Sequence, residues 1–136
     1  MNVSHLTLNE IAKRSHKNSK SKGFWDGNLD PKDRSFVPEK LMLIVSEASE
    51  ALESYRKNEP LSFGSCKGCQ VTVEGDTRCT NCKNLLKPEG MASELADIVI
   101  RVGDLAERLG IDLGRAVEEK HAFNLTRAMK HGGKVC

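Results

Sequence analysis

Two short acidic motifs are the residues of this chain that most clearly indicate chemistry. Glu-x-x-Glu at residues 47–50 and Glu-x-x-Asp at residues 94–97 each lie within a stretch of strong helical periodicity. Residues three apart lie on the same side of a helix, so two such pairs on neighbouring helices would bring four carboxylates together. A cation stabilises such a group, and oxygen ligands that leave room for water favour Mg²⁺ or Mn²⁺. The predicted ligands of this catalytic metal are Glu47, Glu50, Glu94 and Asp97.

Both motifs lie beside apolar stripes that have the period of an α-helix. The first stripe consists of Leu41, Ile44, Val45, Ala48, Leu52 and Tyr55, and the second of Leu95, Ile98, Val99, Val102, Ala106 and Leu109. Amphipathic helices with solvated acidic flanks would give the same pattern without any metal. Two matched pairs at matched positions favour the metal site.

A third helical stretch is predicted to begin at Asp112, a candidate N-cap that follows Gly110. Its apolar face becomes polar further along, at Lys120, Asn124 and Arg127. Lysine and arginine suit phosphate oxygens, whereas asparagine suits a metal, a ribose or a base edge. This face therefore lines a site, or else the helix simply extends from the core into solvent.

In this order the three motifs resemble the MazG-type members of the all-α nucleoside triphosphate pyrophosphohydrolases. Residues 23–26 (Gly-Phe-Trp-Asp) and 109–113 resemble the same family, and the resemblance covers most of the chain except residues 59–90. It implies an all-α fold, with a single helical bundle over residues 1–136. It also implies magnesium-dependent cleavage of a nucleoside triphosphate between the α- and β-phosphates, which gives a nucleoside monophosphate and pyrophosphate.

The resemblance also assigns roles to individual residues. Lys120 and Arg127 would hold the triphosphate, and Asn124 would contact a metal or the sugar. Lys134, in the C-terminal tail, would close over the phosphates. Trp25 would stack on the nucleobase, although a lone tryptophan in a small protein is more often part of the core. Glu47 or Glu50 would act as the base, and the chain would form a homodimer or homotetramer.

The cysteine-rich segment at residues 59–90 has no counterpart in this resemblance. Its two Cys-x-x-Cys knuckles are typical of a tetrahedral structural zinc site, and Gly68 and Gly75 are expected to supply backbone freedom. The expected zinc ligands are Cys66, Cys69, Cys79 and Cys82. Two disulfides or an iron–sulfur cluster would use the same residues, but the sequence shows no secretory signal, which favours reduced thiols. With few large apolar residues, the segment needs a metal to fold, and we interpret it as a small β-rich zinc ribbon inserted between two core helices.

Composition limits the partners of this chain. A net charge of +2 gives no bulk attraction to an acidic polymer, so a nucleic-acid partner is not expected. No segment approaches the roughly 20 apolar residues of a membrane span, and a cytoplasmic location is therefore predicted. Aromatic residues make up only 4% of the chain, which fits an aliphatic helical bundle.

Two other functions fit the same sequence. The zinc ribbon could be the binding surface of an interaction adaptor, with the helices as an oligomeric platform. Alternatively, an enzyme of the same fold could act on a narrower substrate, such as dUTP, dCTP or a phosphoribosyl nucleotide. An adaptor has no need of the two acidic motifs, which favours the enzyme.

Overall fold

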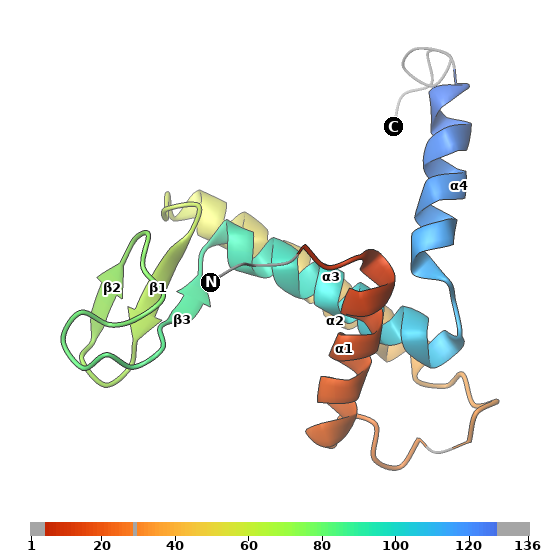
Figure 1. Ribbon diagram of the computed structural model, residues 1–136, viewed down its shortest axis with the longest axis horizontal. Coiled ribbons are helices and arrows are strands. Elements are labelled where there is room, and N and C mark those ends of the chain that lie inside the picture. The colour runs from red at the N-terminus through yellow and green to blue at the C-terminus, as the bar shows by residue number, and fades with distance from the viewer. Residues whose placement is uncertain (1–4, 29, 128–136) are drawn as a thin grey trace. The chain divides into compact units, whose positions relative to one another are not determined.

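The computed structural model describes residues 5–28 and 30–127. Its elements follow in the order α1 (Leu8–Ser21), α2 (Val37–Arg56), β1 (Phe63–Cys66), β2 (Val71–Val73), β3 (Lys87–Glu89), α3 (Met91–Leu109) and α4 (Leu113–Leu125) (Figure 1). The chain divides into two compact units, one formed by residues 1–26 with 103–136 and the other by residues 27–102. The boundary lies within α3, so this helix contributes to both units. Among the described helices, none combines the length and the apolarity that a membrane crossing requires.

The predicted all-α class is wrong, because residues 63–89 contain a three-stranded antiparallel sheet. Its strand order is β2-β1-β3, with Gly64 opposite Val73 in one pair and opposite Pro88 in the other. The resemblance that implies this class does not cover residues 59–90, the segment in which the sheet lies. Strands of three or four residues carry little periodic signal of their own, and here they are defined by pairing between segments. The chain therefore combines four helices with this sheet among its described residues.

The first unit is held together by capping groups and close helix packing. The sequence Thr-x-x-Glu at residues 7–10 predicts a capping box, and Thr7 and Glu10 form it at the start of α1. The Asp112 side chain caps α4 by accepting from the Arg115 backbone N–H. Asn9 links the two helices, because its amide donates to Asp112 at 2.9 Å and accepts from the Gly114 N–H at 2.9 Å.

Close packing of α1 against α3 explains why α3 carries a glycine at residue 103. A Cβ atom at Gly103 would lie 3.0 Å from the Cα of Ala12. Ala12 itself is 2% exposed, so two small residues bring the backbones of α1 and α3 into contact. The other buried apolar residues of this unit are Trp25, Leu105 and Ala106.

In the second unit, the core of the sheet region is small and consists largely of sulfur. Cys66, Cys79 and Leu86 are buried, and Cys69, Val71 and Val73 pack around them. Leu86 lies directly over Gly64, where a Cβ atom would come within 2.8 Å of its side chain. A hydrophobic core this thin gives little stability by itself.

Gly90 joins the sheet to α3 at a position that accepts no side chain. Its φ is +87°, and a Cβ atom there would lie 2.6 Å from the carbonyl oxygen of Pro60. Beside it, the Ala92 N–H donates to the Leu61 carbonyl at 2.9 Å. The segment after α2 is thereby fixed to the first turn of α3.

Gly90→Ala is expected to lower the free energy of unfolding by about 2 kcal/mol, because it adds a backbone clash to the strain of a positive φ. Gly75→Ala is the matched control: its φ is +81°, but nothing lies within 4 Å of a Cβ atom there. Denaturant unfolding of both variants measures the difference. An equal decrease in the free energy of unfolding for the two variants would show that the clash with Pro60 does not contribute to the destabilisation.

Candidate metal centres

Three of the four predicted carboxylates converge between α2 and α3. Glu47 lies on α2, and Glu94 and Asp97 lie one turn apart at the start of α3. One oxygen atom from each lies within 4.8 Å of the others, and the three could hold a metal ion. Glu47 is only 5% exposed, so it is largely withdrawn from solvent. The three-residue spacing thus brings the carboxylates of Glu94 and Asp97 together on one side of α3, as the sequence predicts.

Burial and mutual repulsion disfavour the charged forms of Glu94 and Asp97. Burial raises the pKa of Glu94, and the negative charges of Glu50 and Glu47 raise it further. Burial also raises the pKa of Asp97, to which the charge of Glu47 adds, whereas Arg101 and Lys87 act in the opposite direction. A divalent cation among these groups would relieve the repulsion and stabilise the ionised carboxylates.

The fourth predicted ligand, Glu50, lies outside this cluster. Its side chain is exposed, unlike that of Glu47 one turn earlier. The charge of Glu50 nevertheless reaches Glu94, whose pKa it raises. Glu50 therefore lies at the solvent side of the carboxylates and is not one of the group that could hold a single ion.

Sequence analysis missed Arg101, which contacts the cluster directly. Its Nε atom lies 2.5 Å from Oε1 of Glu47, in an ion pair where Glu47 is 7% and Arg101 39% exposed at the side chain. The signal was present in the sequence, because Arg101 follows Asp97 by four residues on the same helix and so lies on the same face.

The predicted phosphate-binding residues belong to the other unit. Lys120 and Asn124 are exposed on α4, and Arg127 is exposed just beyond its end. The ammonium group of Lys120 lies 5.4 Å from the centre of the Phe123 ring. Lys134 lies outside the described residues. These three predicted residues are thus exposed to solvent on or just beyond α4.

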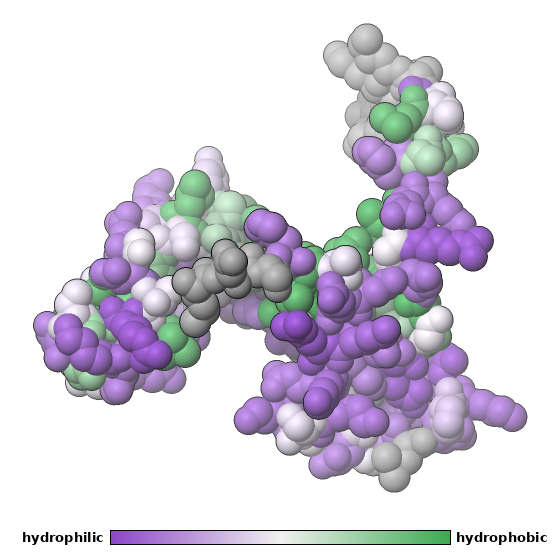
Figure 2. All heavy atoms as spheres, in the orientation of Figure 1, coloured by the Kyte–Doolittle hydropathy of each residue, from purple (hydrophilic) through white to green (hydrophobic). Residues whose placement is uncertain are grey.

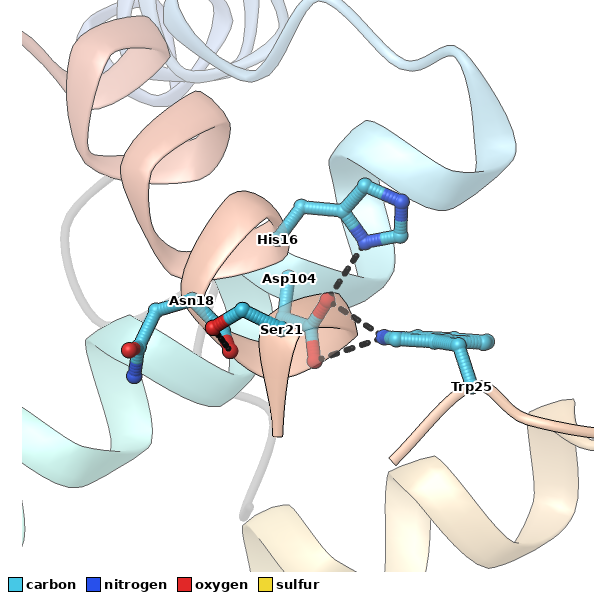
Figure 3. A network of polar contacts seen from close by, with 5 residues as sticks. All are labelled: His16, Asn18, Ser21, Trp25 and Asp104. Carbon is cyan, nitrogen blue, oxygen red and sulfur yellow. Dashed lines mark hydrogen bonds and ion pairs between the residues drawn. The ribbon is translucent and has the colours of Figure 1, made fainter. Parts of the chain in front are cut away.

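Trp25 is buried rather than displayed for stacking. It is 5% exposed, and its indole N–H donates to both carboxylate oxygens of Asp104, at 2.9 and 3.2 Å (Figure 3). The same carboxylate lies 2.7 Å from Nδ1 of His16, whose ring meets the indole edge to face. These contacts give Trp25 a part in the core of the first unit.

Four cysteines form the second candidate centre, close enough together to hold a metal ion such as zinc. One sulfur from each of Cys66, Cys69, Cys79 and Cys82 lies within 4.8 Å of the others, and all four are free thiols. Cys66 ends β1, and its Sγ lies 3.6 Å from that of Cys82. Two segments distant in sequence thereby converge on one point.

The two knuckles share a backbone conformation that turns the chain around the sulfur atoms. The residue that follows each knuckle, Gln70 or Lys83, has a positive φ, of 53° and 63° respectively. Gly75 also has a positive φ, as its predicted freedom allows, whereas Gly68 does not. The bend thus falls one residue after each second cysteine, where the sequence offers no glycine to indicate it.

Local hydrogen bonds shift the pKa values of two of these thiols in opposite directions. Backbone N–H groups of Cys82 and Asn81 lower the pKa of the Cys79 thiol to about 6. Hydrogen bonds to Cys82 and Cys79 raise the pKa of Cys69 to about 12, so Cys69 retains its proton beside the thiolate. A soft divalent metal would take the place of that proton, because thiolates are its ligands.

Comparisons of the chain with protein-family models, with curated proteins and with solved structures found no match.

Proposed function

We propose that this chain is a magnesium-dependent nucleoside triphosphate pyrophosphohydrolase that releases a nucleoside monophosphate and pyrophosphate. The observation that carries the proposal is the convergence of Glu47, Glu94 and Asp97 from two helices. Glu47 is buried and Glu94 and Asp97 are half-buried, and carboxylate oxygens of this kind are suited to Mg²⁺ or Mn²⁺. The sequence resemblance to MazG-type enzymes supplies the reaction.

The carboxylates would hold the metal, and other residues would bind the substrate and accept the proton of the attacking water. When bound, Mg²⁺ would neutralise the charge that develops on the phosphates as the α–β bond breaks. We assign proton abstraction from the attacking water to Glu50, because it is exposed and lies beside the cluster, whereas Glu47 is engaged with Arg101. In this proposal Lys120, Asn124 and Arg127 contact the substrate.

Hydrolysis in ¹⁸O-labelled water tests the position of attack. Attack at the α-phosphorus places the label in the nucleoside monophosphate, and mass spectrometry of the two products detects it there. Label in pyrophosphate, or release of inorganic phosphate, would contradict the proposed bond cleavage.

We further propose that the chain works as a homodimer through an apolar face on α2 and α3. This face consists of Leu41, Val45, Leu52, Tyr55, Leu95 and Val99, each between 39% and 67% exposed. Together they expose on the order of several hundred Å², the size at which an apolar patch marks an interface. A second copy is the natural occupant, because a two-fold axis pairs such a face with itself.

Apolar side chains also reach the surface along α4, visible in green in Figure 2. This second patch consists of Val117, Phe123 and Leu125. Because it lies on a different unit from the α2–α3 face, it provides a separate surface from which a dimer could extend to the homotetramer that the sequence also suggested.

Leu52→Glu is expected to weaken self-association by at least tenfold, because a buried charge at the centre of an apolar interface costs well over 1.4 kcal/mol. Analytical ultracentrifugation over a concentration series measures the dissociation constant. Leu85→Glu is the control, because Leu85 is 72% exposed and belongs to the cysteine-rich segment and to neither helix. Equal association of the wild type and Leu52→Glu would exclude this face as the interface.

The cysteine centre has a structural role in the same proposal. We propose that Zn²⁺ binds the four thiolates and stabilises the sheet, which has little apolar core of its own. Reduced thiols of this kind are usual in the cytoplasm, where we propose that the protein acts, without a nucleic-acid partner.

A further inference from the structure

We propose that Arg101 is a substrate-contacting residue that shares Glu47 with the metal: the guanidinium and a divalent cation compete for this carboxylate, and Arg101 moves to the triphosphate when both ligands are present. This inference rests on the proposed function and extends it to the regulation of the same site.

The geometry of the ion pair supports competition. Arg101 contacts Oε1 of Glu47, and Glu47 is one of the three carboxylates that lie within 4.8 Å of one another. A metal among these oxygens would bring a second positive group to the same carboxylate. Two cations on one carboxylate repel each other, so the arginine weakens metal binding and the metal weakens the ion pair.

The partial exposure of Arg101 supports a second position for its side chain, in contact with the triphosphate. Glu47 is buried at the side chain, but Arg101 is 39% exposed and reaches the cluster from the solvent side. A guanidinium offers five N–H donors in a planar fork, and the hydrogen bond to Glu47 uses the one on Nε. That fork matches phosphate oxygens better than an ammonium group does.

The charge of the substrate explains why movement of Arg101 from Glu47 to the phosphates would favour the reaction. A triphosphate brings several negative charges to carboxylates that already repel one another. An arginine released from Glu47 by the metal becomes available when these charges arrive. It would then stabilise the pyrophosphate leaving group.

Arg101→Gln separates this role from a merely structural one. We expect Mn²⁺ alone, measured by the electron paramagnetic resonance of free Mn²⁺, to bind roughly tenfold more tightly to this variant, because one charge-assisted competitor is lost. We expect kcat/KM for the best nucleoside triphosphate to fall about a hundredfold, the effect of removing one donor to developing charge. Arg101→Lys, which retains charge but lacks the fork, should keep wild-type Mn²⁺ affinity and recover part of kcat/KM.

Arg115→Gln is the matched control, since it breaks an Nε–Oε1 pair with Glu119 at 2.7 Å that is exposed and lies on α4. It should change neither quantity. Unchanged or weaker Mn²⁺ binding by Arg101→Gln would overturn the competition, and unchanged kcat/KM would overturn the substrate contact. If the wild type binds Mn²⁺ but hydrolyses no nucleotide, the proposed function fails, whereas tighter Mn²⁺ binding by Arg101→Gln still supports competition at Glu47.

Discussion

Glu47→Gln should reduce nucleoside triphosphate hydrolysis by about a thousandfold, the upper range for loss of a group that stabilises developing charge. The substitution retains the size of the side chain but removes the negative charge at the centre of the cluster. Metal affinity should fall with the rate, because an amide oxygen is a much weaker ligand than a carboxylate for a hard cation. Initial rates at saturating Mg²⁺, together with Mn²⁺ titration, measure both effects.

Glu53→Gln on the same helix is the control for this substitution. Glu53 is half exposed and pairs with Lys57 at 3.7 Å, a surface contact of little energetic consequence. It should retain the wild-type rate. Loss of activity in Glu47→Gln counts only if circular dichroism shows the helices intact, and a fully active Glu47→Gln enzyme would remove the carboxylate cluster from the mechanism.

Cys79→Ser should abolish zinc binding and unfold the sheet. Cys79 has no exposed surface, and its thiolate is stabilised by backbone N–H groups of its own knuckle. Structural zinc in small domains contributes on the order of 10 kcal/mol, more than a core of three buried residues can replace. Inductively coupled plasma mass spectrometry should find about one zinc per chain in the wild type and none in the variant, on the stoichiometry of a four-cysteine site.

Cys136→Ser provides the matched control, because Cys136 is the fifth cysteine and is not among the expected ligands. It should retain the metal. Amide NMR signals of residues 63–89 should lose their dispersion in Cys79→Ser alone. Wild-type zinc content in Cys79→Ser would exclude the four-thiolate centre, and zinc loss with an intact sheet would show that the metal does not hold the fold.

The link between these two centres runs through a short stretch of chain. β3 leads through Gly90 directly into the turn of α3 that carries Glu94. Within this stretch Lys87 binds Glu89 at 3.0 Å, and its pKa is raised first by that contact and further by the charges of Glu94 and Asp97. The cysteine-rich segment therefore leads directly into the start of the helix on which two of the carboxylates lie.

Local features of the fold were predictable from sequence because short-range rules determine them. The capping box of Thr7 with Glu10 and the Asp112 cap depend on residues within one turn, and both are confirmed. Pro38 likewise lies in the first turn of α2, as its fixed φ allows. The all-α class failed because strands of three or four residues depend on pairing partners further along the chain.

Features that depend on the environment of a helix face were harder to predict. Helical periodicity places Glu47 and Glu50 on one shoulder, but only packing decides that the first is buried and the second exposed. The apolar residues beside them, such as Leu52, are exposed in the single chain because a helix pair covers only its facing sides. The acidic motifs do not indicate Arg101, because they identify ligands of a cation and not the counter-charge that a buried carboxylate requires.

The most direct test of the central claim is pyrophosphate release from a panel of canonical and deoxy nucleoside triphosphates, with Mg²⁺ and with chelator, using the zinc-loaded protein. We expect release that requires Mg²⁺, yields the monophosphate and is lost in Glu47→Gln. Absence of release from every nucleotide by a folded, zinc-loaded protein would contradict the pyrophosphohydrolase and favour a zinc-dependent interaction module.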